Sequence, residues 1–154
     1  MLHLRTLLAT DIAIIQNWPP YPPEFEKLDY ALRDKGWLAE FYGKPGTRIY
    51  VAEQGQEIIA FTILSNTQPS ATEFRIALHA DKIGQGLGKK ITAMTLEKGF
   101  AELCLSRIHL IVRVNNHRAV HLYKSLGFLE NGHCLETING REVYFLAMVL
   151  SGST

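Results

Sequence analysis

Gly84-Gln85-Gly86-Leu87-Gly88-Lys89-Lys90 joins a strand-like run, residues 73–79, to a helix-like run, residues 91–103. Glycine has no side chain, so it allows a sharp turn and a close approach of the backbone to a ligand. The following helix directs its unpaired N–H groups and the positive end of its dipole into the turn. This stretch therefore predicts a strand–turn–helix unit whose turn binds an anion, above all a phosphate.

Two common phosphate-binding motifs do not fit this turn. The dinucleotide fingerprint Gly-x-Gly-x-x-Gly finds its first two glycines in Gly84 and Gly86, but its third position is Lys89. The mononucleotide P-loop fails at Ile83, where it needs glycine, and at Lys90, where it needs Ser or Thr. Taken alone, the turn is equally well explained as a tight connection between a strand and a helix.

A second motif begins about thirty residues later with Asn116-His117-Arg118-Ala119-Val120-His121-Leu122-Tyr123-Lys124-Ser125-Leu126-Gly127-Phe128. Four side chains recur at i, i+3, i+4 and i+7, on one face of a helix: Ala119, Leu122, Tyr123 and Leu126. Asn115 or Asn116 suits the N-cap, and Gly127 suits the left-handed position after the last turn. On these residues alone the segment is a well-capped amphipathic helix followed by a strand.

Together the two segments resemble the GNAT superfamily of acyl-CoA N-acetyltransferases. The pyrophosphate turn of that family reads Arg/Gln-x-x-Gly-x-Gly/Ala; this chain matches it at Gly86 and Gly88 but has Ile83 in place of Arg or Gln. The later motif reads Asn-x-x-Ala-x-x-Leu-Tyr-x-x-x-Gly-Phe and is matched at Asn116, Ala119, Leu122, Tyr123, Gly127 and Phe128. The resemblance spans about half of the chain, residues 73–148. It implies acetyl-CoA as co-substrate and an amine as acceptor.

The pattern of apolar residues and turn signals predicts an α/β domain with a single mixed, mostly antiparallel sheet flanked by about four helices. Strands are expected at 2–7, 47–53, 57–64, 72–79, 107–114, 128–136 and 141–150. Helices are expected at 11–17, 24–41, 87–103 and 116–126, and a loop at 66–71. Asn139-Gly140 predicts a tight hairpin between the last two strands. Residues 1–154 are expected to form one domain, with the GNAT-like acyl-CoA N-acyltransferase fold that the resemblance implies.

Composition places the chain among ordinary globular proteins. It is 47% hydrophobic and 20% charged with a net charge of +1, which favours neither a nucleic acid nor a membrane as partner. The longest uncharged apolar run, Val143 to Leu150, is too short to span a bilayer. Cys104 and Cys134 lack metal or redox spacing, so we expect a cytoplasmic protein with free thiols. His117 and His121 share a helix face without an obvious third ligand, so no metal is expected.

The resemblance assigns the coenzyme and the leaving group to particular residues. The backbone N–H groups of the turn would hold the pyrophosphate; the turn residues are Gln85, Gly86, Leu87, Gly88 and Lys89. The strand before the turn would pair with the pantetheine arm through Ala77, Leu78 and His79. By the same resemblance Asn116 contacts the coenzyme and the phenol of Tyr123 protonates the departing thiolate. Without the resemblance, Asn116 is a helix cap and Tyr123 packs on the sheet.

Acetyl transfer to an amine also needs a group that accepts the ammonium proton. Alternate residues of 73–79 form an apolar face, namely Phe74, Ile76 and Leu78, and the side chains of Glu73 and His79 point the other way. Glu73 can accept the proton, directly or through water, or hold the amine by its charge; an ion pair is the alternative. His79 is the rival base because imidazole titrates near neutrality. The candidate catalytic residues are therefore Tyr123, Glu73 and His79.

The acceptor amine is left open by the sequence. Residues 119–141 look like the branch of the superfamily that holds spermidine and ribosomal-protein alanine N-acetyltransferases, but residues 141–144 depart from it. We expect an amine-bearing small molecule or a protein N-terminus, with direct attack in a ternary complex, and we leave a homodimer open. The alternatives are an aminosugar or amino acid acceptor, a longer acyl group, and a sensor that binds acyl-CoA without catalysis. Residues 18–25 are expected to wall the acceptor cleft as an aromatic rim, or to form a rigid connector.

Overall fold

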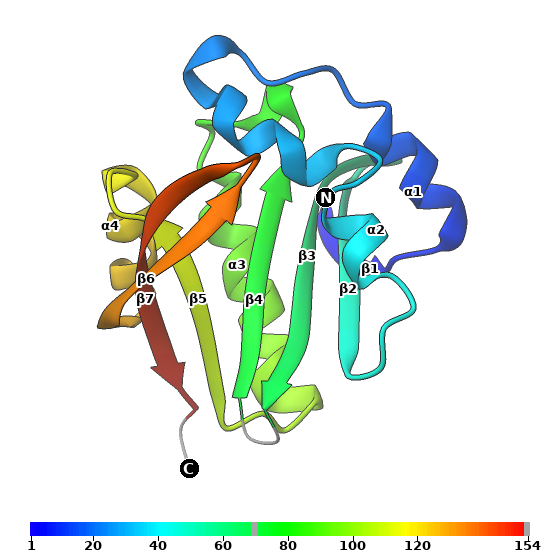
Figure 1. Ribbon diagram of the computed structural model, residues 1–154. Helices are drawn as coiled ribbons and strands as arrows, with labels where there is room; N and C mark the ends of the chain where they lie inside the picture. The colour runs from blue at the N-terminus through cyan, green and yellow to red at the C-terminus, as the bar shows by residue number, and fades with distance from the viewer. Residues whose placement is uncertain (69–70, 153–154) are drawn as a thin grey trace. The chain divides into compact units, whose positions relative to one another are not determined.

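The computed structural model describes residues 1–68 and 71–152. Within them seven strands form one sheet in the order β1-β2-β3-β4-β5-β7-β6 (Figure 1). The strands are β1 Leu2–Thr6, β2 Thr47–Gln54, β3 Glu57–Gln68, β4 Ala71–Leu78, β5 Arg107–Arg113, β6 Leu129–Ile138 and β7 Arg141–Ser151. The recorded strand pairs are antiparallel except β4 with β5, which is parallel. The prediction of an α/β fold with one mixed, mostly antiparallel sheet is confirmed.

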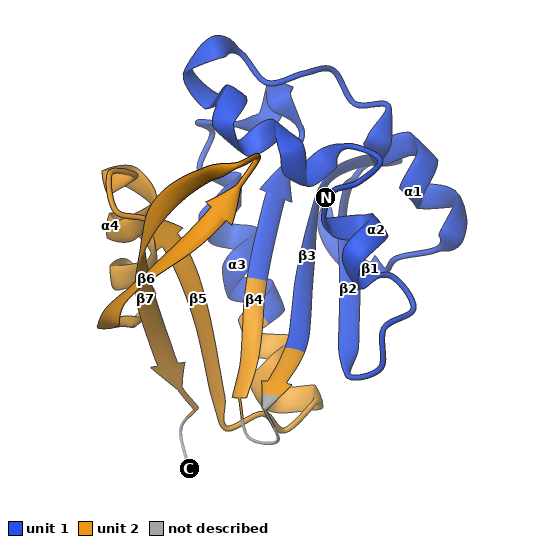
Figure 2. Cartoon of the chain, in the orientation of Figure 1, with its two compact units in different colours: residues 1–65, 75–95 blue, residues 66–74, 96–154 orange. Residues whose placement is uncertain are grey.

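Helical segments connect these strands. They are α1 Ala9–Gln16, the 3₁₀ segment η1 Pro23–Leu32, α2 Trp37–Phe41, the 3₁₀ turn η2 Ala80–Lys82, α3 Leu87–Glu97, the π-helical turn η3 Lys98–Glu102 and α4 His117–Ser125. The chain divides into two compact units, residues 1–65 with 75–95 and residues 66–74 with 96–154 (Figure 2). Strands β3 and β4 each contribute residues to both units.

In the first unit, alternate residues of β2 and β3 face opposite sides of the sheet. On one side Ile49, Val51, Phe61 and Ile63 pack with side chains of α1, η1 and α2. On the other side Ala52 and Ala60 pack with Ile91 of α3. Figure 1 shows α2 in front of β2, and α3 on the opposite side of the sheet, behind β4. The period of two along each strand thus supplies one apolar surface for the N-terminal helices and another for α3.

In the second unit every second residue of β5 is buried, and β6 forms an exposed edge of the sheet. Asn139 and Gly140 have φ of 52° and 76° and form a two-residue turn, with Ile138 paired to Arg141 across it. Positive φ at both turn positions gives the twist that a tight hairpin needs. The predicted hairpin is confirmed.

Residues 24–41 do not form the single helix that we expected. Segment η1 ends at Leu32, and α2 begins only at Trp37. A Cβ at Gly36 would lie 2.4 Å from the carbonyl oxygen of Ala31, closer than real contacts allow. The chain therefore folds back tightly here, where only glycine fits. In addition, the guanidinium of Arg33 binds carbonyl oxygens of the preceding connector.

Two further elements end differently from the prediction. Residues 66–68 continue β3 and Ala71 begins β4, so the expected loop at 66–71 is mostly strand; residues 69–70 lie outside the described residues. The α-helix expected to reach residue 103 ends at Glu97 and continues as a π-helical turn. Among the described helices, none is long and apolar enough to cross a lipid bilayer.

Candidate active site

The glycine turn has the backbone geometry that a phosphate seat requires. Gly84 and Gly86 have φ of 86° and 79°, in the left-handed region that glycine adopts readily. Helix α3 begins at Leu87, so its first unpaired N–H groups belong to Leu87 and the residues just after it. A Cβ built on Gly86 would meet no atom within 4 Å. The space above the turn is therefore open at the positive end of the α3 dipole.

Position 83, where the family motif has Arg or Gln, points toward the protein core. The Ile83 side chain packs against the cluster formed by the N-terminal segments. The side chain of Gln85 bonds to the backbone just before the turn: its Nε2 donates to the carbonyl oxygen of Asp81 at 2.8 Å. Lys89 and Lys90 are exposed at the start of α3. An anion in this turn would thus rely on backbone N–H groups and exposed lysines.

The end of β4 next to the turn is held from two directions. Ala77 is buried in the cluster of the N-terminal segments, whereas Leu78 packs on the α3 side. The N–H of His79 donates to the carbonyl oxygen of Ile59 in β3 at 2.8 Å. The carbonyl oxygen of Leu78 accepts a hydrogen bond from the Tyr21 hydroxyl at 2.6 Å. The pairing recorded between β4 and β5 lies at the other end of β4, where Thr72 and Glu73 oppose β5.

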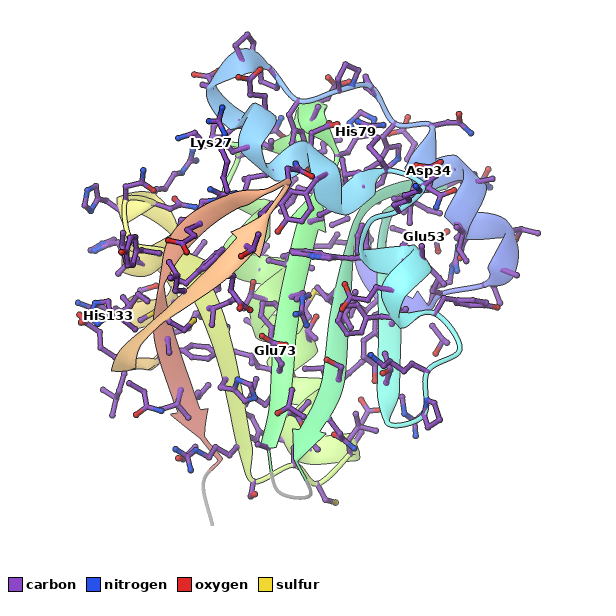
Figure 3. The ribbon with its side chains drawn as sticks, viewed as in Figure 1. Lys27, Asp34, Glu53, Glu73, His79 and His133 are labelled. Atoms are coloured by element: carbon purple, nitrogen blue, oxygen red, sulfur yellow. The ribbon has the colours of Figure 1, made fainter. Side chains whose placement is uncertain are left out.

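Figure 3 shows His79 near the end of β4. Its imidazole is fixed by two neighbouring residues. Its Nδ1 accepts the N–H of Asp81 at 3.0 Å, and its ring lies edge-on to Trp18 with the ring centroids 5.1 Å apart. Because Nδ1 is an acceptor, a neutral ring carries its proton on Nε2. In this tautomer one nitrogen is engaged and the other is already protonated. The arrangement therefore does not prepare His79 to accept a proton.

A cavity of about 630 Å³ lies beside His79 in the same unit. Its walls carry four carboxylates and two basic groups, from Asp11, Glu53, Glu57, Asp81, Arg5 and Lys82. The carboxylate of Asp11 is bound to the guanidinium of Arg5 at 2.8 Å, and Glu53 to the same guanidinium at 3.1 Å. One guanidinium offsets only one of these two negative charges, so the lining keeps more negative than positive groups.

Tyr123 of α4 lies between two phenylalanine rings in the second unit. The ring centroids are 6.4 Å apart for Phe74 and 5.7 Å apart for Phe128, both with edge-on geometry. Gly127, with φ of 101°, ends the helix and returns the chain so that the N–H of Phe128 donates to the Tyr123 carbonyl oxygen. Burial raises the pKa of Tyr123 above that of a free phenol. The hydroxyl therefore stays protonated at physiological pH.

Asn116 caps α4, as the motif predicts. Its Oδ1 accepts the N–H of Ala119 at 3.2 Å, which satisfies one of the unpaired donors of the first turn. The Nδ2 donor of the same amide takes no part in this capping hydrogen bond. The predicted cap is confirmed, and Nδ2 is the group of Asn116 that has the chemistry to bind a coenzyme carbonyl.

Glu73 and Tyr123 lie on opposite faces of the sheet. Phe74 packs on Tyr123, and successive strand residues alternate, so Glu73 points to the other face. There its negative charge acts on Cys134: burial, then Glu136 and Glu73, raises the pKa of that thiol. A thiol held protonated is a poor nucleophile.

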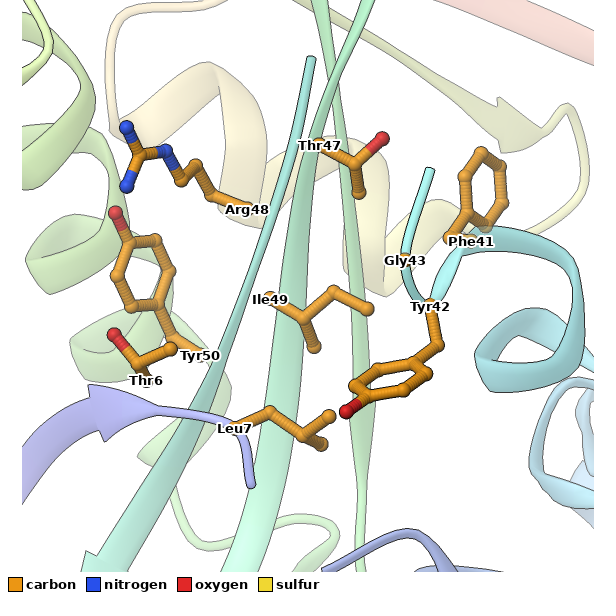
Figure 4. A pocket seen from close by; sticks show the side chains of 9 residues that line it. All are labelled: Thr6, Leu7, Phe41, Tyr42, Gly43, Thr47, Arg48, Ile49 and Tyr50. Atoms are coloured by element: carbon orange, nitrogen blue, oxygen red, sulfur yellow. The ribbon is translucent and has the colours of Figure 1, made fainter. Parts of the chain in front are cut away.

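A second hollow of about 270 Å³ contains none of the predicted site residues (Figure 4). It is lined by the end of β1, the end of α2 with the residues after it, and the first half of β2. Over the residues that the structure describes, no group of three or more His, Cys, Asp or Glu side chains is placed to hold a metal ion.

The expectation of an aromatic rim at residues 18–25 is wrong for its two largest members. Trp18 and Tyr21 are only 6% and 8% exposed, because both pack into the core cluster of the first unit, although Trp18 also lines the cavity beside His79. The rigid connector is the interpretation that fits. The bond from Tyr21 to the end of β4 was not foreseen, because the partner of a single hydroxyl leaves no pattern in the sequence.

Known proteins resemble the chain over most of its length. The model of the acetyltransferase (GNAT) family matches residues 12–128. Spermidine N(1)-acetyltransferase from Vibrio cholerae serotype O1 is 34% identical over 160 residues, covering 91% of this chain and 87% of that protein. A solved structure of spermidine N-acetyltransferase from Vibrio cholerae in complex with CoA and spermine has a TM-score of 0.75 at 28% identity, covering 97% of this chain and 95% of that one. A shorter match, 34% over 71 residues, joins 45% of this chain to 38% of spermidine N(1)-acetyltransferase from Escherichia coli K12. The chain therefore belongs to the acetyltransferase (GNAT) family.

Proposed function

We propose that this chain, an acyl-CoA-dependent N-acetyltransferase, transfers the acetyl group of acetyl-CoA to a primary amine of a polyamine. The polyamine acceptor is supported by the spermidine N(1)-acetyltransferase that is 34% identical over 91% of this chain. A solved relative bound to CoA and spermine supports it further. The observation that carries the chemistry is the Tyr123 phenol, held between Phe74 and Phe128 with a raised pKa.

In this proposal the coenzyme binds mainly to backbone groups. Its pyrophosphate accepts hydrogen bonds from the N–H groups of residues 85–89, where the open space above Gly86 lets a phosphate approach. Its pantetheine arm pairs with residues 77–79, in the part of β4 beyond the recorded pairs with β5. Asn116 adds the donor Nδ2 from the start of α4. Lys89 and Lys90 compensate for the inward-facing Ile83.

Tyr123 acts as the general acid. The neutral amine attacks the thioester carbonyl carbon, and the carbon–sulfur bond of the tetrahedral intermediate then breaks. As the bond breaks, the Tyr123 hydroxyl gives its proton to the sulfur, and free CoA leaves as a thiol. The phenolate recovers a proton from solvent. A phenol is protonated at neutral pH, and because burial raises the pKa of Tyr123 the hydroxyl keeps its proton until the thiolate forms.

Glu73 is the base that we assign to the amine. It faces the side of the sheet opposite Tyr123, so the proton leaves the amine on one side while the sulfur receives one on the other. His79 is the weaker candidate because its Nδ1 is engaged by Asp81. Residues six positions apart in a strand are separated by roughly 20 Å, so the two bases are alternatives rather than partners.

Direct transfer in a ternary complex is the simplest route. Burial and neighbouring carboxylates keep the Cys134 thiol protonated, which disfavours an acetyl-cysteine intermediate there. A solved relative from Vibrio cholerae is described as dodecameric, so we propose that this chain also self-associates.

The experiment compares the wild-type chain with Tyr123→Phe in a thiol-release assay. Acetyl-CoA is offered with spermidine, with spermine and with peptides that carry a free N-terminus. We expect turnover with the polyamines, and a loss of kcat of about a hundredfold or more in the variant with unchanged affinity for acetyl-CoA. Tyr144→Phe, at an exposed tyrosine of the same unit, serves as the control and should keep full activity.

Each other outcome points to a different function. Turnover with peptides but not with polyamines would replace the acceptor and keep the enzyme class. Binding of acetyl-CoA without turnover on any amine would favour the acyl-CoA sensor. Full activity of Tyr123→Phe would remove the proposed acid.

A further inference from the structure

The connector between α1 and η1 is built to hold one hydroxyl in place. Residues 18–23 read Trp-Pro-Pro-Tyr-Pro-Pro, so from residue 19 to 23 the only backbone N–H belongs to Tyr21. That N–H donates to Asp29 Oδ1 at 3.2 Å, and the same carboxylate binds the guanidinium of Arg33 at 2.6 Å. Arg33 in turn donates to the carbonyl oxygens of Gln16 and Trp18. The connector is therefore held at its N-terminal end and in the middle.

The Tyr21 side chain links the connector to the end of β4. Its ring is buried in the core of the first unit, and its hydroxyl donates to the carbonyl oxygen of Leu78 at 2.6 Å. The other end of the same peptide bond, the N–H of His79, donates to Ile59 of β3 at 2.8 Å. A trans peptide is planar, with its C=O and N–H pointing in opposite directions. The Leu78–His79 peptide is thus held at both ends, and the two hydrogen bonds restrain its rotation about the strand axis.

Fixing this peptide also directs the neighbouring donor. In an extended strand the N–H and C=O of one residue point to the same side, so the N–H of Leu78 faces away from β3 together with its carbonyl. Tyr21 already occupies that carbonyl. The N–H of Leu78 is then the group that β4 offers on this side to a carbonyl oxygen of the pantetheine arm.

From this geometry we propose that Tyr21 is a positioning residue for acyl-CoA: its hydroxyl fixes the Leu78–His79 peptide so that the end of β4 receives the pantetheine arm. The inference rests on the proposed function, which lays the coenzyme along residues 77–79. Tyr21 itself touches no reacting atom; it acts through the backbone of β4.

The test uses Tyr21→Phe, which removes the hydroxyl and keeps the buried ring. The control is Tyr42→Phe, the same chemical change at an exposed tyrosine of the same unit. We expect the KM and Kd for acetyl-CoA to rise roughly five- to tenfold in Tyr21→Phe, with the KM for the polyamine unchanged. Amide exchange followed by NMR should show faster exchange of the His79 N–H without ligand. Asp29→Asn, which loosens the connector, should shift the same quantities less.

The outcomes separate a positioning role from a structural one. A lower melting temperature with unchanged Kd for acetyl-CoA, or unchanged exchange at His79, would overturn the proposal. If Tyr21→Phe fails to fold, the Kd for acetyl-CoA and the His79 amide exchange are measured on Asp29→Asn, and they decide the proposal in the same way. If the wild-type chain does not bind acetyl-CoA at all, the proposed function fails and this role fails with it, whereas the exchange measurement still reports whether Tyr21 holds the peptide.

Discussion

At the scale of single residues, buried hydroxyls between β3 and α3 differ in whether they have partners. Thr95 Oγ1 lies 2.9 Å from Thr62 Oγ1 and 3.0 Å from the Ile91 carbonyl oxygen. Thr92 is 1% exposed, and its Oγ1 has no hydrogen-bond partner among the described residues. A buried hydroxyl without a partner costs free energy, whereas one that is bonded contributes modestly. The two threonines of α3 should therefore respond oppositely to the same substitution.

We predict that Thr92→Val raises the free energy of unfolding by about 1 kcal/mol, because valine keeps the shape and removes the unsatisfied oxygen. Thr95→Val should lower it by about the same amount, since Thr62 loses its partner. Urea denaturation measures both variants, with an unchanged m-value as evidence that the unfolding reaction is the same. A destabilised Thr92→Val would mean that an ordered water satisfies the hydroxyl.

At the scale of elements, the strand–turn–helix unit depends on glycines in the left-handed region. Gly86 and Gly55 have φ of 79° and 66°, and a Cβ at either would meet no atom within 4 Å. The two positions therefore carry the same backbone cost for alanine and differ only in what lies above them. Gly55 is in the turn between β2 and β3, and Gly86 is in the proposed phosphate seat.

We predict that Gly86→Ala and Gly55→Ala each lower the free energy of unfolding by roughly 1–2 kcal/mol. Only Gly86→Ala should weaken acetyl-CoA binding, by about tenfold or more, because its methyl group occupies the space that a phosphate needs. Isothermal titration with acetyl-CoA checks this. Equal affinity in the two variants would place the pyrophosphate elsewhere.

At the scale of the whole molecule, paired carboxylates set the response to acid. Asp11 is buried and bound to Arg5 and to the N–H of Leu8, and the hydrogen bond from Arg5 is the main cause of its lowered pKa. The hydrogen bond from Arg33 lowers the pKa of Asp29 in the same way. A carboxyl group whose pKa is lower in the folded state stabilises the fold above its unfolded pKa of about 3.9. This contribution is lost as the pH falls through the folded-state value.

We predict that Asp11→Asn lowers the free energy of unfolding by about 2 kcal/mol at pH 7, because Arg5 keeps Glu53 but loses the charged hydrogen bonds to the buried carboxylate of Asp11. The difference from the wild type should shrink as the pH falls below about 4, where the wild-type carboxylate is also protonated. Thermal unfolding between pH 2 and 7 measures this dependence. Asp34→Asn, at an exposed carboxylate, is the control and should follow the wild type; a constant difference at all pH values would contradict the linkage.

The local elements were predictable because local chemistry decides them. The left-handed glycines at 84 and 86, the cap at Asn116 and the hairpin at Asn139-Gly140 each follow from the conformational preferences of the residues themselves. The alternation along β4 likewise separated Phe74 from Glu73. The motif then pointed to Tyr123, although the two aromatic rings around it come from β4 and from the residue before β6.

Other features were decided by contacts between residues far apart in the chain. The helix expected at 24–41 breaks because Gly36 must approach the Ala31 carbonyl, and because Arg33 is drawn to the connector instead of to its own helix. The direction in which a polar side chain points decides three features of the site. They are the burial of Tyr21, its hydrogen bond to Leu78 and the tautomer of His79. Such directions have no period in the sequence, because a hydrogen bond between remote groups forms only once packing has brought them within about 3 Å.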